Sequence, residues 1–166
     1  MEINSPRMRI VDTELSLKLE ELEFECNNYG YWLLCATGEE TNASGFKYSK
    51  AIYFFSRDGE ESYYRYIDDS GEYVDSYLVI KKVKTYDTAN LINYLHDWYC
   101  QSWTIEDGFF EDDNNNSVSF FETFTHLGLD GGKGQRLKSF QDSSMQDSLA
   151  KAIIDLLEYE NEKRVN

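Results

Sequence analysis

The sequence has little proline, no long apolar run and no segment typical of a linker between domains. Pro6 is the single proline among 166 residues, and no stretch is rich in Pro, Gly or Ser together. The longest apolar run, Tyr31 to Ala36, is far shorter than the roughly 18 residues that a membrane span needs. The first ten residues lack the apolar segment of a signal peptide. We therefore expect one globular domain over 1–166, with frayed ends at 1–7 and 161–166.

The same absences predict where the protein works. Without an export signal or a membrane span, we expect a cytoplasmic location, either in a bacterial cytosol or in the cytosol of a phage-infected host. Cys26, Cys35 and Cys100 are an odd number without a paired spacing, so we expect reduced thiols that pack as small hydrophobic residues.

Metal-binding and catalytic signatures are equally scarce. His96 and Cys100 have the i, i+4 spacing that lets two side chains on a helix share a metal ion. Cys100 falls outside the apolar stripe of that helix, and His126 is the only other histidine. We therefore expect no metal, no cofactor and no catalytic residue.

Basic residues are absent from one long segment, and the charge is therefore distributed unevenly along the sequence. The sequence has 31 acidic and 16 basic residues, for a net charge of −15. Residues 85–132 contain nine acids and neither Lys nor Arg, and residues 10–46 contain eight acids against Lys18 alone. The rest of the chain is nearly balanced. Almost all of the excess charge therefore comes from two segments.

A field of this sign repels nucleic acids and anionic membranes and attracts basic proteins. The composition is typical of inhibitors whose carboxylates imitate nucleic-acid phosphates, such as phage anti-defence or anti-CRISPR proteins and bacterial immunity proteins. We therefore expect a basic partner (a nuclease, a toxin or a nucleic-acid-binding effector) and no direct binding to nucleic acid. The expected contact residues are the acids in the two densest runs: Glu20, Glu21, Glu23, Glu25, Glu106, Asp107, Glu111, Asp112 and Asp113.

Two other functions fit the composition. A small enzyme with a carboxylate-based site, with or without a metal, would place several acids around a pocket. An adaptor whose acidity only maintains solubility would scatter them over the surface. A single acidic face requires that the fold bring the segments 10–46 and 85–132 together.

Hydrophobic periodicity predicts an α+β fold with about six strands, mostly antiparallel and arranged largely as a meander, and about two helices. Residues 8–26 alternate with period two, which favours strands, although Leu15, Leu19, Leu22 and Cys26 also fit helical spacing. Strands are expected at 31–37, 47–56, 62–67, 73–84 and 118–126, with Arg57-Asp58-Gly59-Glu60 as a hairpin turn between the second and third of these.

Helices are predicted over roughly 87–100 and 144–160. Asp87 or Thr88 can cap the first. Ser143 or Ser144 can cap the second, where Ser144 with Asp147 forms a capping box. Residues 103–110 are expected to cover the sheet, and 127–134 to form a glycine-rich connection. Because the helices follow the strands and do not alternate with them, the class is α+β.

Overall fold

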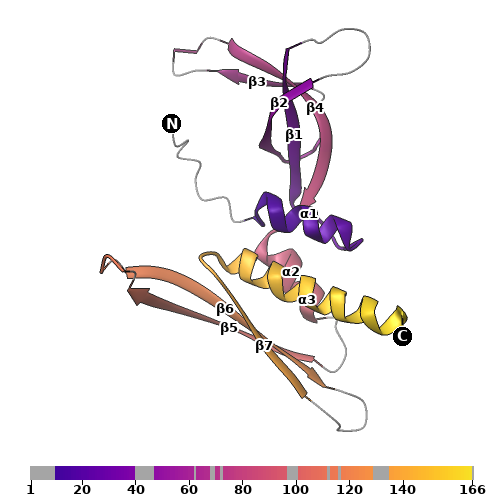
Figure 1. Cartoon of the computed structure of the whole chain (residues 1–166), viewed down its shortest axis with the longest axis vertical. Helices are drawn as coiled ribbons and strands as arrows, with labels where there is room; N and C mark the ends of the chain where they lie inside the picture. Colours follow the sequence, from indigo (N-terminus) through magenta and orange to yellow (C-terminus); the bar gives the residue numbers. More distant parts are fainter. Residues whose placement is uncertain are drawn as a thin grey trace. The chain divides into compact units, whose positions relative to one another are not determined.

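The computed structural model describes residues 10–39, 47–61, 63–67, 70–71, 73–96, 101–111, 113–115, 117–128 and 135–165. These residues form three helices and seven strands, so the predicted α+β class is confirmed (Figure 1). In chain order the elements are α1 (Thr13–Glu21), β1 (Gly30–Glu39), β2 (Lys47–Ser56), β3 (Tyr63–Ile67), β4 (Tyr73–Thr85), α2 (Thr88–His96), β5 (Gln101–Glu111), β6 (Ser117–Gly128), β7 (Gln135–Asp142) and α3 (Met145–Val165).

The chain divides into two compact units. Unit 1 contains Met1–Asn27 and Tyr86–Asn166, and unit 2 contains Asn28–Thr85. Unit 1 holds all three helices and the strands β5 to β7, whereas unit 2 holds β1 to β4. The prediction of a single domain over 1–166 stays a prediction.

Unit 2 is a four-stranded antiparallel sheet in the order β2-β1-β4-β3. Antiparallel pairing was expected, but the predicted hairpin between 47–56 and 62–67 is wrong, because β2 and β3 are not neighbours. The predicted turn does bend the chain: Gly59 has a left-handed φ of 66°, and its N–H donates to the Ser56 hydroxyl over 2.9 Å. The apolar strand β1, with Leu33 and Cys35 fully buried, takes the centre of the sheet between β2 and β4.

In unit 1, residues 13–21 form the helix α1, so the predicted strand over this segment is wrong. Asp12 caps the helix, with its Oδ1 accepting a hydrogen bond from the N–H of Leu15 over 2.7 Å. Leu19 is completely buried, and Leu15 and Leu22 pack against the same core. The helical spacing of these leucines therefore outweighs the period-two alternation of the segment.

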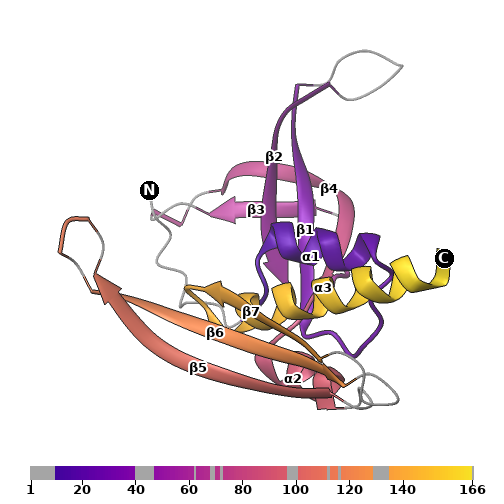
Figure 2. The same cartoon turned by 60° about the horizontal axis from the view of Figure 1, so that its bottom comes forward.

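The second sheet has the order β5-β6-β7, and all of its pairs are antiparallel. Residues 103–110, expected to cover a sheet, are part of this sheet, because Trp103 and Ile105 alternate with polar residues at period two. Strand β7 was not predicted. The helices of unit 1 lie on one face of this sheet, as both views show (Figure 1, Figure 2).

The core of unit 1 lies between the sheet and the helices. Leu91 of α2 and Leu149, Ile153 and Leu156 of α3 are almost completely buried there, and Trp103 and Ile105 of β5 pack against them. On β6 the hydroxyl group of Thr123 forms a short hydrogen bond with that of Ser148 in α3.

Both predicted helices are present, with the predicted caps. Asp87 and Asn90 exchange reciprocal hydrogen bonds at the start of α2. At the start of α3 the N–H of Asp147 donates to the Ser144 hydroxyl, which in turn donates to the Asp147 carboxylate over 2.6 Å. α3 continues to Val165, so residues 161–165, expected to be frayed, are helical.

Candidate functional site

The end of the β5–β6 hairpin extends beyond the third strand. β7 pairs with β6 only from Gly128 to Phe121, whereas β5 and β6 stay paired out to Glu111 and Ser117. We call this two-stranded extension the arm: residues 108–111 and 117–120, with the described turn residues Asp113–Asn115 between them. The turn reverses through Asn115, which has a left-handed φ of 61°. The arm is therefore not paired with β7.

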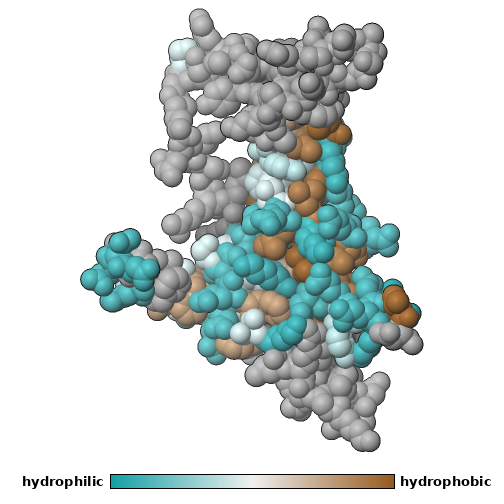
Figure 3. All heavy atoms as spheres, in the orientation of Figure 1, coloured by the Kyte–Doolittle hydropathy of each residue, from teal (hydrophilic) through white to brown (hydrophobic). Residues whose placement is uncertain are grey.

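Exposed carboxylates lie on and beside the arm. Asp107, Glu111 and Asp113 are exposed, and none of them forms an ion pair with another described residue. Phe109 lies among them with 75% of its side chain exposed, an unusual position for a phenylalanine. The tip of the arm is hydrophilic, as the left edge of the space-filling view shows (Figure 3). Asp112, another expected contact residue, lies outside the described residues.

The second expected acidic run lies at the end of α1. Glu20 and Glu21 are in its last turn, and Glu23 and Glu25 follow it; all four are exposed. Carboxylates are unfavourable at a helix C-terminus, because the last carbonyl groups already carry negative partial charge. Lys18 offsets part of this repulsion by pairing with Glu21 over 3.8 Å.

The structure places these two acidic runs at opposite ends of unit 1. α1 and α3 run side by side in the same direction: Asp12 before α1 bonds to Asp147 in the first turn of α3, and Lys18 later in α1 pairs with Glu158 later in α3. The arm begins beside the start of α3, whereas the acidic end of α1 lies beside the later turns of α3 (Figure 1, Figure 2). The fold therefore does not bring the two runs onto a shared face.

The excess charge nevertheless belongs almost entirely to unit 1. Over its sequence ranges unit 1 has 22 acids and nine bases, a net charge of −13, whereas unit 2 has nine acids and seven bases, a net charge of −2. Two segments that are distant in the sequence are thus joined in one strongly acidic unit. This relation between charge and folding unit is not visible from the sequence alone.

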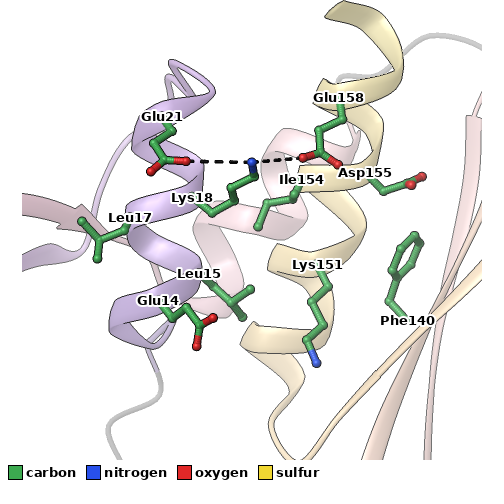
Figure 4. Close-up of a pocket in the computed structure, with 10 residues that line it drawn as sticks. All are labelled: Glu14, Leu15, Leu17, Lys18, Glu21, Phe140, Lys151, Ile154, Asp155 and Glu158. Carbon is green, nitrogen blue, oxygen red and sulfur yellow. Dashed lines mark ion pairs between the residues drawn. The ribbon is translucent and has the colours of Figure 1, made fainter. Parts of the chain in front are cut away.

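A groove of about 570 Å³ lies between α1, α3 and β7. Its apolar lining includes Leu15, Ile154 and Phe140 (Figure 4). Lys18 lies between Glu21 and Glu158, with 3.2 Å between its Nζ and the nearer Glu158 oxygen. The other described lysine of the lining, Lys151, is also paired with a carboxylate.

That second lysine pair affects the ionisation of Asp142. Lys151 Nζ lies 2.7 Å from Asp142 Oδ2 and donates a further hydrogen bond to the carbonyl group of Gln141. Burial by itself would raise the pKa of Asp142. The hydrogen bond and charge of Lys151, with the backbone N–H groups of Ser143 and Ser144, outweigh burial and hold the pKa below its usual value.

The motifs considered for other chemistry have ordinary surroundings where they are described. His96 is exposed and its ring is nearly perpendicular to that of Trp103, with ring centroids 6.1 Å apart. Cys100 lies outside the described residues. Burial raises the pKa of the Cys35 thiol to about 11, so it is protonated at neutral pH. The part of the chain that the structure describes holds no group of three or more His, Cys, Asp or Glu side chains suited to a metal ion.

None of the three described helices is both long and apolar enough to cross a membrane. Comparison of the chain with protein-family models, with curated proteins and with solved structures gives no match.

Proposed function

We propose that this protein binds and neutralises a basic, nucleic-acid-acting partner, and that the arm of unit 1 is its main contact element. The observation that carries the proposal is the set of exposed carboxylates on and beside the arm, Asp107, Glu111 and Asp113, which have no ion pair with a described residue. Carboxylates that a fold does not neutralise internally are available to a partner's lysine and arginine residues.

Phe109 strengthens the proposal. A large aromatic side chain that is 75% exposed loses favourable burial in the free protein and regains it when a partner covers it. An aromatic residue surrounded by charged ones is the usual composition of an interface centre and its rim. The charge of unit 1 would steer a basic partner from beyond the contact distance.

The partner class follows from the same charge. Nucleic-acid-binding proteins carry basic grooves that neutralise phosphates, and an acidic arm that enters such a groove competes with the nucleic acid. An immunity protein against a nuclease toxin and a phage protein directed against a host defence nuclease both fit this description. The expected complex forms quickly and weakens as salt rises, because screening shortens the range of its charge interactions.

The test compares two variants with the same change in charge. In one, Asp107, Glu111 and Asp113 are replaced by Lys; in the other, Glu20, Glu23 and Glu25 at the far end of unit 1 are replaced by Lys. Each variant and the unmodified protein are used for affinity capture from cytosol of the native host at low and high salt. Captured proteins are identified by mass spectrometry, and the binding of the purified partner is then measured by calorimetry.

We expect the unmodified protein to capture a basic nucleic-acid-acting protein at low salt, and the arm variant to lose it. The α1 variant should retain binding with a much smaller loss of affinity. A partner lost equally from both variants would indicate nonspecific attraction to the net charge. A captured partner that is acidic or insensitive to salt would contradict the proposed function.

A further inference from the structure

One face of the β5-β6-β7 sheet carries none of the described helices of unit 1. Thr123 and Thr125 are buried on the face toward α3, and Lys138 on that face pairs with Asp155 of α3 over 2.5 Å. Residues of the other parity therefore point away from the helices. We call this surface the open face; its described side chains are Thr104, Glu106, Phe120, Glu122, Phe124, Ser139 and Gln141.

Two carboxylates oppose each other directly on the open face. Glu106 of β5 pairs in register with Glu122 of β6, and the next position across the sheet, on β7, is Gln141. Like charges at directly opposed positions destabilise an antiparallel pair. Neither glutamate forms an ion pair with a described residue, and the described side chains of the open face include no Lys or Arg.

Aromatic rings border this carboxylate pair. Phe120 lies opposite Gly108, and a Cβ atom at Gly108 would meet the Phe120 ring at 2.5 Å, so the ring lies directly over the glycine. Gly108 is two residues from Glu106 on the same strand and therefore shares its face. Phe120 and Phe124 each lie two residues from Glu122 on β6, and both are half-buried. The absence of a side chain at Gly108 thus leaves room for the end of the Phe120 ring beside the two carboxylates.

We propose that the open face binds an arginine side chain of a basic protein partner, with Glu106 and Glu122 as its carboxylate ligands and Phe120 as a stacking surface. This inference rests on the proposed function and adds a second contact surface, because Asp107, Phe109 and Glu111 have the opposite parity on β5. A guanidinium group has donors enough for two carboxylates and a flat face that stacks on an aromatic ring. A lysine ammonium group matches the charge and lacks the planar fork. A second copy of the chain is disfavoured, because unit 1 itself has a net charge of −13.

The test uses an oligo-arginine and an oligo-lysine peptide of equal length as probes, with binding measured by calorimetry at low salt. Three variants act on the open face: Glu106→Gln and Glu122→Gln each remove one charge, and Gly108→Ala displaces the Phe120 ring while leaving every charge in place. Glu14→Gln is the matched control, because Glu14 is exposed on α1 and has no ion pair with a described residue. Circular dichroism verifies the folding of each variant.

We expect the unmodified protein to bind the arginine peptide more tightly than the lysine peptide. Each glutamine variant of the open face should lower the affinity for the arginine peptide roughly tenfold, the scale of one charge-assisted hydrogen bond. Gly108→Ala should remove the preference for arginine over lysine, and Glu14→Gln should change the affinity less than about twofold, as for a distant screened charge. Equal effects of Glu14→Gln and Glu122→Gln, or equal affinity for the two peptides, would overturn this inference.

A second measurement separates binding from structure. If the carboxylate pair serves to bind a partner, Glu122→Gln removes repulsion in the free protein and raises its midpoint of thermal unfolding. The same change lowers the affinity for the arginine peptide. If the pair is structural, the same change lowers the midpoint. Self-association of the unmodified protein in sedimentation experiments that Glu122→Gln abolishes would assign the open face to a second copy and overturn the inference. Loss of arginine binding in the open-face variants alongside unchanged capture of the natural partner would also overturn it and leave the proposed function standing.

Discussion

The backbone N–H of Asp12 donates a hydrogen bond to the Oδ1 atom of Asp147 over 2.9 Å, across 135 residues of sequence. Asp147 also completes the capping box of α3 with Ser144, so one carboxylate links the starts of two helices. Asp147→Ala removes both sets of contacts and should lower the free energy of unfolding by roughly 1–2 kcal/mol, the usual scale of a lost helix cap. Urea denaturation at neutral pH measures this change. A loss no larger than that of an exposed control such as Glu14→Ala would contradict it.

The ionisation of Asp147 gives a separate prediction for pH. Burial raises its pKa above the usual value, despite the hydrogen bonds from Ser144 and Asp12, and Asp12 and Asp142 add repulsion. A raised pKa means that ionisation costs more in the folded state, so this group lowers stability as pH rises from about 3.9 through the folded pKa. Asp147→Asn lacks the effect. The stability of this variant relative to the unmodified protein should therefore increase over that pH interval in denaturation series, and a constant difference would contradict the prediction.

Asp142 should behave in the opposite way. Its folded pKa is lowered by Lys151 and by neighbouring N–H groups despite its burial. The stabilisation is therefore complete above about pH 3.9 and is lost as pH falls through the folded pKa. Asp142→Asn should destabilise the protein at neutral pH and approach the unmodified protein in acid. Lys151→Met, which removes the other partner, should flatten the same acid transition, and an unaltered transition in both variants would exclude the ion pair as its source.

Ser148 makes two buried hydrogen bonds between α3 and the sheet. Its hydroxyl donates to the carbonyl oxygen of Phe140 over 3.0 Å and also contacts the Thr123 hydroxyl. Ser148→Ala leaves both sheet groups without this partner and should cost roughly 1–3 kcal/mol. Thr123→Val keeps the bond between Ser148 and Phe140 and should cost less. The reverse order in chemical denaturation would show that the Thr123 contact is the more important one.

Thiol reactivity tests the environment of the two described cysteines. Cys35 is completely buried with a pKa of about 11, whereas Cys26 is partly exposed. In a Cys100→Ser background, a thiol reagent near pH 8 should modify Cys26 in the folded protein and Cys35 only on unfolding, because the thiolate is the reacting form. Mass spectrometry of the modified peptides distinguishes the two sites. Equal labelling rates in the folded protein would contradict the burial of Cys35.

Local chemistry accounts for what could be predicted from the sequence. The caps at Asp87 and Ser144 involve residues three apart, and the helices that they begin were expected. The segment of α1 was predicted as strand because Leu15, Leu17 and Leu19 alternate, although Leu15, Leu19 and Leu22 also have helical spacing. Only the packing of the second set against the core distinguishes the two patterns. The prediction of a hairpin between β2 and β3 is wrong for a similar reason, because a favourable turn sequence at Gly59 does not determine which strand lies beside β2.

The candidate site shows the same limit. The acidic residues on the arm were expected as contacts, because charge density is visible in sequence. Their separation from Glu20 and Glu25 depends on the parallel alignment of α1 and α3, which is a tertiary property. Glu122 was not expected as a contact, because it is an isolated acid in the sequence. Its importance arises from strand register, which places it opposite Glu106 and beside the ring over Gly108.

The discontinuity of unit 1 has a consequence for the protein during synthesis. The chain leaves unit 1 after Asn27 and returns at Tyr86, and the pairing of Gly30 with Thr85 holds the two connections together. Every strand of unit 2 has therefore emerged from the ribosome well before α3, on which α1 packs. The packing of α1 is therefore incomplete until α3 has been synthesised. Until then the apolar side chains of α1 that α3 covers in the folded protein are exposed, and such exposure favours aggregation of a nascent chain.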